Sequence, residues 1–165
     1  MDVGRTADLT IRKASPHDVE LLLGIQRAAS AAAFAHIFPP DLYPFPDDGV
    51  RELWVAALAD PEVDVYVTEG EPVGSVSVGH GYLRTLYVVP EEWSRGVGSA
   101  LHDHGVARLR ARGVAEAKLW TLSANEAGRR FYERRGWRLT GETRVVPFPP
   151  NPLDVQYSLR FDLLQ

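Results

Sequence analysis

The residues with the clearest chemical potential stand in the segment LYVVPEEWSRGVGSAL, residues 86–101. An apolar, β-branched run ends at Pro90, a polar turn follows, and Gly96-Val97-Gly98-Ser99 begins a predicted helix. The first turn of a helix leaves backbone N–H groups unpaired, and the helix dipole adds partial positive charge there. The glycines also allow a ligand to approach the backbone closely. The segment therefore predicts a binding site for a phosphate or pyrophosphate.

Two common nucleotide motifs fit this segment poorly. The P-loop pattern G-x-x-x-x-G-K-[ST] is absent from the sequence. A dinucleotide fingerprint requires a small third residue, but Leu101 stands there, although Glu116 lies where a ribose-binding acid is found. The preceding runs are typical of antiparallel strands, which also disagrees with a doubly wound fold. Dinucleotide binding is therefore disfavoured.

The composition is that of a soluble protein, with 45% hydrophobic and 24% charged residues, and it has no run of the length that a membrane span needs. Because there is no cysteine, disulfides, thiolate metal sites and a cysteine nucleophile are excluded. The N-terminus has no apolar stretch typical of a secretion signal, so we expect a cytoplasmic protein.

The net charge of −4 is unevenly distributed. Residues 37–64 are rich in Asp and Glu, whereas residues 95–138 are rich in Arg. This pattern fits two solvated faces of opposite sign, or a cationic ligand near the first segment and an anionic ligand near the second. Nucleic acid is disfavoured as a partner because the balance is acidic and no reading motif accompanies the basic residues.

Hydrophobic periodicity and turn residues predict the elements that must position these groups. The expected strands are 8–13, 63–68, 73–78, 82–89, 117–122, 137–143 and 155–161. The expected helices run from a Ser15 cap towards Phe34, from 48 to 58, from 97 to a stop at Gly113, and from a capping box at Ser123-Ala124-Asn125-Glu126 to Arg135. This order predicts one α+β domain, residues 1–165, with a parallel right-handed crossover between the fourth and fifth strands.

The sequence resembles the GNAT superfamily of acetyl-CoA-dependent N-acetyltransferases. The resemblance rests on LYVVPEEWSRGVGSAL, on SANEAGRRFYERRGW and on the N-terminal TIRKASPHDVELLL, and it covers almost the whole chain. In the family signature Q/R-x-x-G-x-G/A the glycines correspond to Gly96 and Gly98, but Trp93 stands at the first position. The resemblance implies a mixed, mostly antiparallel sheet of about seven strands with about four helices and a splayed V between strands 4 and 5.

The resemblance also implies the cofactor contacts. The pantetheine arm of acetyl-CoA would pair with the fourth strand as an extra strand, and the turn before the helix would hold the pyrophosphate. The implied residues are Leu86, Tyr87, Val88, Ser94, Arg95, Gly96, Val97, Gly98, Ser99, Asn125 and Arg130.

Amide formation from a thioester needs a neutral amine, an oxyanion stabiliser and an acid for the departing thiolate. A lysine-like amine costs roughly 4.6 kcal/mol to deprotonate at pH 7. The resemblance places the general acid at Tyr132, whose alternative role is packing beside Phe131. A backbone N–H of the fourth strand, at Val88, is expected to stabilise the oxyanion.

The base is not evident. Where family members carry a glutamate on the fourth or fifth strand, this chain has Tyr82 and Trp120. His36 and His80 are the titratable substitutes, and a water relay is the favoured route. No metal site is expected, because His102 and His104 stand two residues apart on a helix and face different directions.

The acceptor site is expected in the helix–loop–helix region, opposite the proline-rich loop 145–152. The candidate substrate residues are Phe34, His36, Phe38, Tyr43 and Trp54, with Tyr82 from the fourth strand. Core packing is the alternative role for each. The chain is thus predicted to transfer acetyl from acetyl-CoA to a primary amine, of a small molecule or a peptide, by direct attack in a ternary complex. A non-catalytic acyl-CoA-binding or regulatory module is the alternative, and a monomer and a homodimer both remain open.

Overall fold

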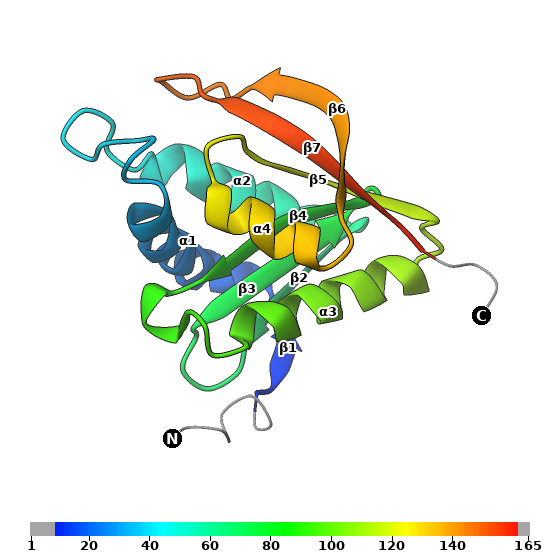
Figure 1. The fold of residues 1–165 in the computed structure, drawn as a ribbon. Coiled ribbons are helices and arrows are strands. Elements are labelled where there is room, and N and C mark those ends of the chain that lie inside the picture. Colours follow the sequence, from blue (N-terminus) through cyan, green and yellow to red (C-terminus); the bar gives the residue numbers. More distant parts are fainter. Residues whose placement is uncertain (1–8, 162–165) are drawn as a thin grey trace.

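The computed structural model describes residues 9–161, which form a seven-stranded sheet with helices on both faces (Figure 1). The strands are β1 Ile11–Lys13, β2 Val63–Thr68, β3 Gly74–Gly79, β4 Tyr82–Val88, β5 Glu116–Leu122, β6 Arg138–Val145 and β7 Leu153–Arg160. The helices are α1 Val19–Ala33, α2 Asp47–Ala59, α3 Val97–Ala111 and α4 Glu126–Arg134, with 3₁₀ turns η1 Pro16–Asp18 and η2 Pro90–Glu92. The predicted start of the first strand at Asp8 lies outside the described residues.

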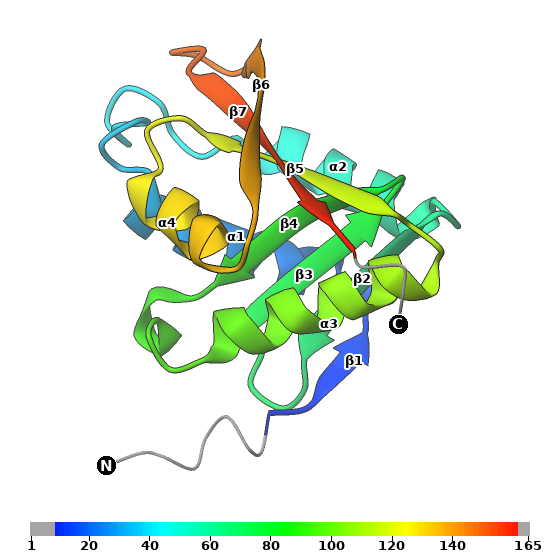
Figure 2. The ribbon, with the colours of Figure 1, turned by 45° about the vertical axis from the view of Figure 1, so that its right-hand side comes forward.

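The sheet has the strand order β1-β2-β3-β4-β5-β7-β6. The neighbours are antiparallel except β4 and β5, which are parallel and share the single register pair Tyr82↔Lys118 within the described chain. Beyond that pair β5 and β7 turn away from β4, which leaves one edge of β4 open (Figure 2). The predicted α+β sheet with a V between the fourth and fifth strands is confirmed.

Two hydrophobic cores hold the helices against the sheet. One core, beneath α3, contains Val76, Leu101 and Trp137; the other, beneath α1 and α2, contains Leu22, Trp54 and Val65. Figure 1 shows α1 and α2 on one face and α3 on the other. The two faces therefore offer separate approaches to the open edge of β4.

A bulge in β4 determines which of its side chains face α3 and which face α1 and α2. The register passes from Val78↔Leu83 to Ser77↔Thr85, so Arg84 is left without a partner on β3. Such an extra residue locally redirects a strand. After the bulge, Leu86 packs into the α3 core, whereas Tyr87 packs towards α1 and α2. Tyr87 therefore lies on the face opposite α3.

Two helix starts differ in detail from the prediction. The Ser15 cap begins a 3₁₀ turn, in which Ser15 N–H donates to Asp18 Oδ2 at 2.8 Å, before α1 follows. The predicted capping box with Ser123 as the N-cap of α4 is wrong. Asn125 is the N-cap, and its Oδ1 accepts from Gly128 N–H at 3.1 Å, because the turn from Leu122 to Asn125 keeps Ser123 outside the helix.

Candidate active site

The turn between β4 and α3 has the geometry of an anion site. Ser94 and Gly96 both adopt positive φ, 62° and 84°, and Gly96 is the N-cap of α3. The backbone bond that begins the helix runs from Ala100 N to Gly96 O at 3.0 Å. The N–H groups of the first turn, from Val97 to Ser99, consequently have no carbonyl of the helix to bond. They are available to an anion at the positive end of the helix dipole.

The open edge of β4 carries a feature that the sequence did not predict. Val89 N–H donates to Val73 O at 2.9 Å, so the alternation of an antiparallel strand directs the N–H and C=O of Val88 to the opposite edge, towards the gap. Trp93 follows η2, and its Nε1–H donates to Val88 O at 2.7 Å. Trp93, the residue that departs from the family signature, therefore already donates a hydrogen bond to a backbone carbonyl on the edge expected to pair with pantetheine.

Arg135 lies closer to this turn than the predicted Arg130. Its guanidinium bonds Ser99 Oγ, donates to Phe131 O at 2.9 Å and stacks 3.5 Å from the centre of the Phe131 ring. Arg130, by contrast, is 59% exposed and lies 3.9 Å from Glu126. The run Arg134-Arg135 at the end of the helix was the only signal for this contact, and it does not distinguish a phosphate-side arginine from a solvated one.

A cavity of about 580 Å³ opens on the α1–α2 face and reaches the edge of β4. Its walls come from the end of α1, the α1–α2 loop, β4, β5 and the β6–β7 hairpin. The lining residues used below are Phe34, Tyr43, Leu86, Tyr87, Trp120, Asn125, Tyr132, Arg144, Phe148 and Asp154.

The predicted substrate residues separate into two groups. Phe34, Phe38 and Tyr43 line the cavity. Trp54 lies elsewhere: it is 3% exposed in the α1–α2 core, where its Nε1–H donates to Gln26 Oε1 at 2.8 Å. Tyr82 is also absent from the cavity wall, at the closed end of β4, with its hydroxyl accepting from Gln156 Nε2 at 3.2 Å.

Neither histidine considered as a base lines the cavity. His36 is exposed, with Nε2 at 3.2 Å from Ala124 O. His80 lies in the β3–β4 turn, with Nε2 at 2.8 Å from Asp60 Oδ2. The carboxylate that the cavity does contain is Asp154 of β7, which the sequence did not predict.

Tyr132 lies where the cavity and the cofactor edge meet. Its ring packs edge-on against Phe131 and Trp137, at centroid distances of 5.4 and 6.1 Å. Burial, with a smaller contribution from Tyr87, raises the pKa of the Tyr132 hydroxyl above its usual range. The phenol is therefore protonated throughout the physiological pH range and can donate a proton.

Asn125 reaches the cavity while capping α4. Its Nδ2 donates to Thr121 Oγ1 at 3.3 Å, and its Oδ1 is the cap described above. A Cβ at Gly128 would lie 2.3 Å from Asn125 Nδ2, so the glycine makes room for this arrangement.

The histidines of α3 face different partners. His102 is buried and accepts from Trp137 Nε1 at 3.0 Å, whereas the His104 ring packs 4.4 Å from Tyr66. Within residues 9–161, no three His, Asp or Glu side chains are grouped to hold a metal ion.

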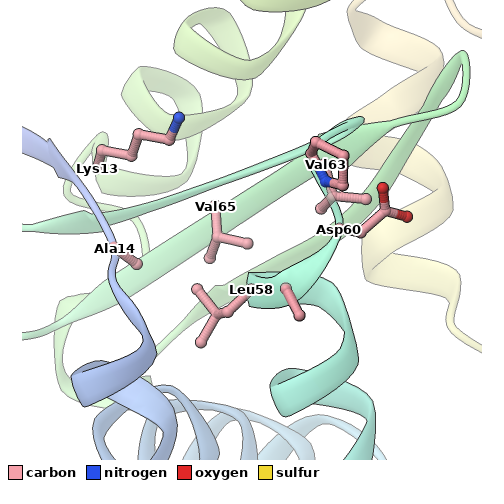
Figure 3. A pocket seen from close by; sticks show the side chains of 8 residues that line it. Lys13, Ala14, Leu58, Asp60, Val63 and Val65 are labelled. Carbon is pink, nitrogen blue, oxygen red and sulfur yellow. The ribbon is translucent and has the colours of Figure 1, made fainter.

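A second, smaller hollow of about 180 Å³ lies between the end of α2 and the β1–β2 half of the sheet (Figure 3). Lys13 and Asp60 stand at its two ends, and apolar side chains such as Leu58 and Val65 form the wall between them. It shares no lining residue with the larger cavity. The site is therefore built on the larger cavity alone.

A sheet split between two parallel strands, with a turn of anion-site geometry at the end of the split and a cavity on the opposite face, is the arrangement expected of an acyl-CoA-dependent acyltransferase. The comparisons with known proteins agree. The profile of the acetyltransferase (GNAT) family matches residues 31–137. The chain is 31% identical over 140 residues to the uncharacterized N-acetyltransferase YafP of Escherichia coli, covering 84% of this chain and 87% of that one. The chain therefore belongs to the GNAT family of acetyltransferases and transfers acetyl groups from acetyl-CoA to an amine.

Other relatives extend this comparison. A phosphinothricin N-acetyltransferase of Streptomyces coelicolor is 32% identical over 108 residues, 65% of this chain and 63% of that protein. Among solved structures, the PaiA N-acetyltransferase of Thermoplasma acidophilum in complex with coenzyme A has a TM-score of 0.70 at 17% identity, covering 93% of this chain and 99% of that one. A GCN5-related N-acetyltransferase structure from Rhodopseudomonas palustris reaches 0.74 at 20% identity, covering 93% and 96%. At these identities the structures establish the fold. None of the helices described here is long and apolar enough to cross a membrane.

Proposed function

We propose that the chain acetylates a primary amine held in the 580 Å³ cavity, by direct attack within a ternary complex. The observation that carries this proposal is the position of Leu86, Tyr87 and Tyr132. These residues line the cavity and also border the open edge of β4, so an amine in the cavity and a cofactor on that edge meet there. The absence of cysteine supports direct attack, because no thiol is present to carry the acyl group.

The residues of the turn and of β4 fit acetyl-CoA, which supplies the thioester when bound. Backbone N–H groups from Ser94 to Ser99 hold the pyrophosphate, and Arg95 and Arg135 add positive charge beside it. The edge from Leu86 to Val88 pairs with the pantetheine arm, and Asn125 contacts that arm from α4. Arg130 is 59% exposed beside Glu126 on α4 and would add positive charge on the same side.

Tyr132 serves as the proton donor of the reaction, and the backbone N–H of Val88 stabilises the negative charge that forms. The Tyr132 hydroxyl donates its proton to the departing thiolate, a role supported by its place on the cavity wall and by its being protonated at neutral pH; its raised pKa makes it a weak acid that bonding to the thiolate must assist. The Val88 N–H, which points into the gap, stabilises the negative charge that develops on the carbonyl oxygen. Water in the open cavity carries the amine proton away, since neither His36 nor His80 lines the cavity.

The competing function is an acyl-CoA-binding module without turnover. The test is Tyr132→Phe, compared with Tyr66→Phe, which removes a hydroxyl from β2 outside the cavity. Acetyl-CoA binding is measured by calorimetry, and turnover by thiol release with a panel of amines. We expect both variants to bind acetyl-CoA like the wild type, and Tyr132→Phe alone to lose about 10²–10⁴-fold in kcat.

Unchanged kcat in Tyr132→Phe would overturn the assignment of the acid. Binding of acetyl-CoA by the wild type without thiol release from any amine would favour the non-catalytic module.

We further propose a single domain acting in the cytoplasm, as a monomer or homodimer, on amine acceptors and not on nucleic acid. The absence of cysteine and the net charge of −4 support this proposal.

A further inference from the structure

The cavity contains an ion pair that the mechanism above does not use. Asp154 of β7 is 7% exposed, and its Oδ2 accepts from Arg144 Nε at 3.0 Å. The register places Asp154 between Leu122 of β5 and Arg144 of β6. Among the described residues that line the cavity, Asp154 is the only carboxylate.

Arg144 is held in place but keeps part of its binding capacity. Its guanidinium lies 4.4 Å from the centre of the Trp120 ring, and its Nε is fixed by Asp154. The side chain is 54% exposed. Within residues 9–161 no hydrogen bond is made to its two terminal nitrogens or to Asp154 Oδ1. An immobilised guanidinium with a free planar edge is suited to bind a carboxylate through two parallel hydrogen bonds.

We propose that Arg144 and Asp154 form a subsite that selects an acceptor carrying a carboxylate beside its amine, that is, a free amino acid. This proposal rests on the proposed function, in which the cavity receives the acceptor. Arg144 binds the carboxylate through its terminal nitrogens, and Asp154 Oδ1 binds the ammonium group.

The charges of the pair explain the selectivity. Arg144 and Asp154 together are neutral, so the pair alone gives a simple amine or a simple carboxylate little net attraction, while the exposed Arg84 adds a separate positive charge to the cavity wall. A zwitterion places opposite charges a few ångströms apart and satisfies both partners at once. An acceptor that lacks its carboxylate leaves the terminal nitrogens of Arg144 without a partner, and one that lacks its ammonium group leaves Asp154 Oδ1 without one. Either loss weakens acceptor binding.

The position of Asp154 also suits the reaction. Asp154 of β7 and Tyr87 of β4 both line the cavity, and the negative charge of Asp154 adds to burial in raising the pKa of Tyr87 to about 12. An amine bound at Asp154 therefore shares the cavity with the β4 residues that border the edge proposed for the thioester. Phe34, Tyr43 and Phe148 offer an aromatic wall to the apolar part of the acceptor.

The first experiment measures kcat/KM by thiol release for each of the twenty amino acids, for their amides and for their decarboxylated amines. We expect at least one amino acid to exceed its own amide and amine by about ten- to hundredfold, because both lack the carboxylate. Amides or amines that react as well as every amino acid would overturn the subsite. Absence of thiol release from all three series, with acetyl-CoA bound, would instead overturn the proposed function.

The second experiment uses Arg144→Gln, with Arg138→Gln as the matched control, since Arg138 is an exposed arginine on the same strand outside the cavity. Arg144→Gln is expected to raise KM for the preferred amino acid about ten- to hundredfold and so to remove most of its advantage over its own amide and amine. Arg138→Gln is expected to change neither. An equal loss for all three acceptors in Arg144→Gln, with an unchanged melting temperature, would contradict the proposal.

Discussion

At the scale of single residues, Trp93 shows how one substitution in a signature changes a binding edge. Its indole N–H donates to Val88 O at 2.7 Å, and the side chain is 44% exposed. A cofactor amide that pairs with this carbonyl must displace the indole. On the proposed pairing of the cofactor with β4, Trp93 competes with it for one hydrogen bond.

The variant Trp93→Phe keeps an aromatic ring but removes the donor. We expect it to bind acetyl-CoA about two- to tenfold more tightly, as the gain of one ordinary hydrogen bond predicts. Calorimetric titration of both proteins measures the difference. Weaker binding by the variant would mean that the indole itself contacts the cofactor.

At the scale of elements, the contact between α3 and the start of β6 depends on one neutral histidine. Trp137 Nε1–H donates to His102 Nε2, so the ring proton lies on Nδ1 and is donated to Asp103 Oδ1 at 2.9 Å. Burial lowers the pKa of His102, and the hydrogen bond to Asp103 opposes this shift only in part. Protonation at Nε2 would end the bond from Trp137.

This arrangement predicts a loss of stability on acidification. The unfolded chain takes up a proton near pH 6.5, whereas folded His102 does so only at lower pH, so stability falls as the pH drops below about 6.5. The loss is at most about 1.4 kcal/mol per pH unit. Urea unfolding between pH 7.5 and 5 measures it, and His102→Gln should show a shallower decline. Identical slopes for the two proteins would exclude His102 as the titrating group.

The elements themselves were largely predictable, because their signals are local. The bounds of β2 agree with the prediction at both ends, and glycines at the β2–β3 and β3–β4 turns marked the hairpins. The α4 cap was not predictable, since Ser123 and Asn125 are both good caps and the preceding turn decides between them. The pair Arg144–Asp154 was not predictable either. Its members reach the cavity only because β7 pairs with β5 and β6 pairs with β7, and residue spacing gives no signal for these pairings.

At the scale of the whole molecule, a buried carboxylate holds the C-terminal end of α3 against the first half of the sheet. Asp64 of β2 is fully buried and accepts from Nε of Arg108 in α3 at 2.8 Å and from Nε of Arg112, the C-cap of α3, at 2.7 Å. Lys13 of β1 lies 3.5 Å from its other oxygen. Burial alone would raise the pKa of Asp64, but the hydrogen bonds from the two arginines outweigh it and lower the pKa to about 2.

Asp64 therefore stabilises the fold at neutral pH. Its contribution is fully present above about pH 3.8 and is lost as the pH falls towards 2. Asp64→Asn should cost about 3 kcal/mol at pH 7, at the lower end for a broken buried ion pair because the arginines are partly exposed. Urea unfolding at pH 7 and pH 3 tests this, and the difference between the two proteins should narrow at pH 3. A constant difference would show that the loss is one of packing and not of charge.

The residues proposed to bind the acetyl donor and those proposed to select the acceptor lie in different parts of the chain. The family profile ends at residue 137, one residue before β6, whereas Arg144 and Asp154 both follow it. The anion-binding turn, the edge of β4 and Tyr132 all precede that boundary. On the proposed assignments, the residues that bind the acetyl donor come before the terminal hairpin, and the hairpin supplies the pair that selects the acceptor. Exchanging the hairpin alone would then change the acceptor and leave the binding of acetyl-CoA intact.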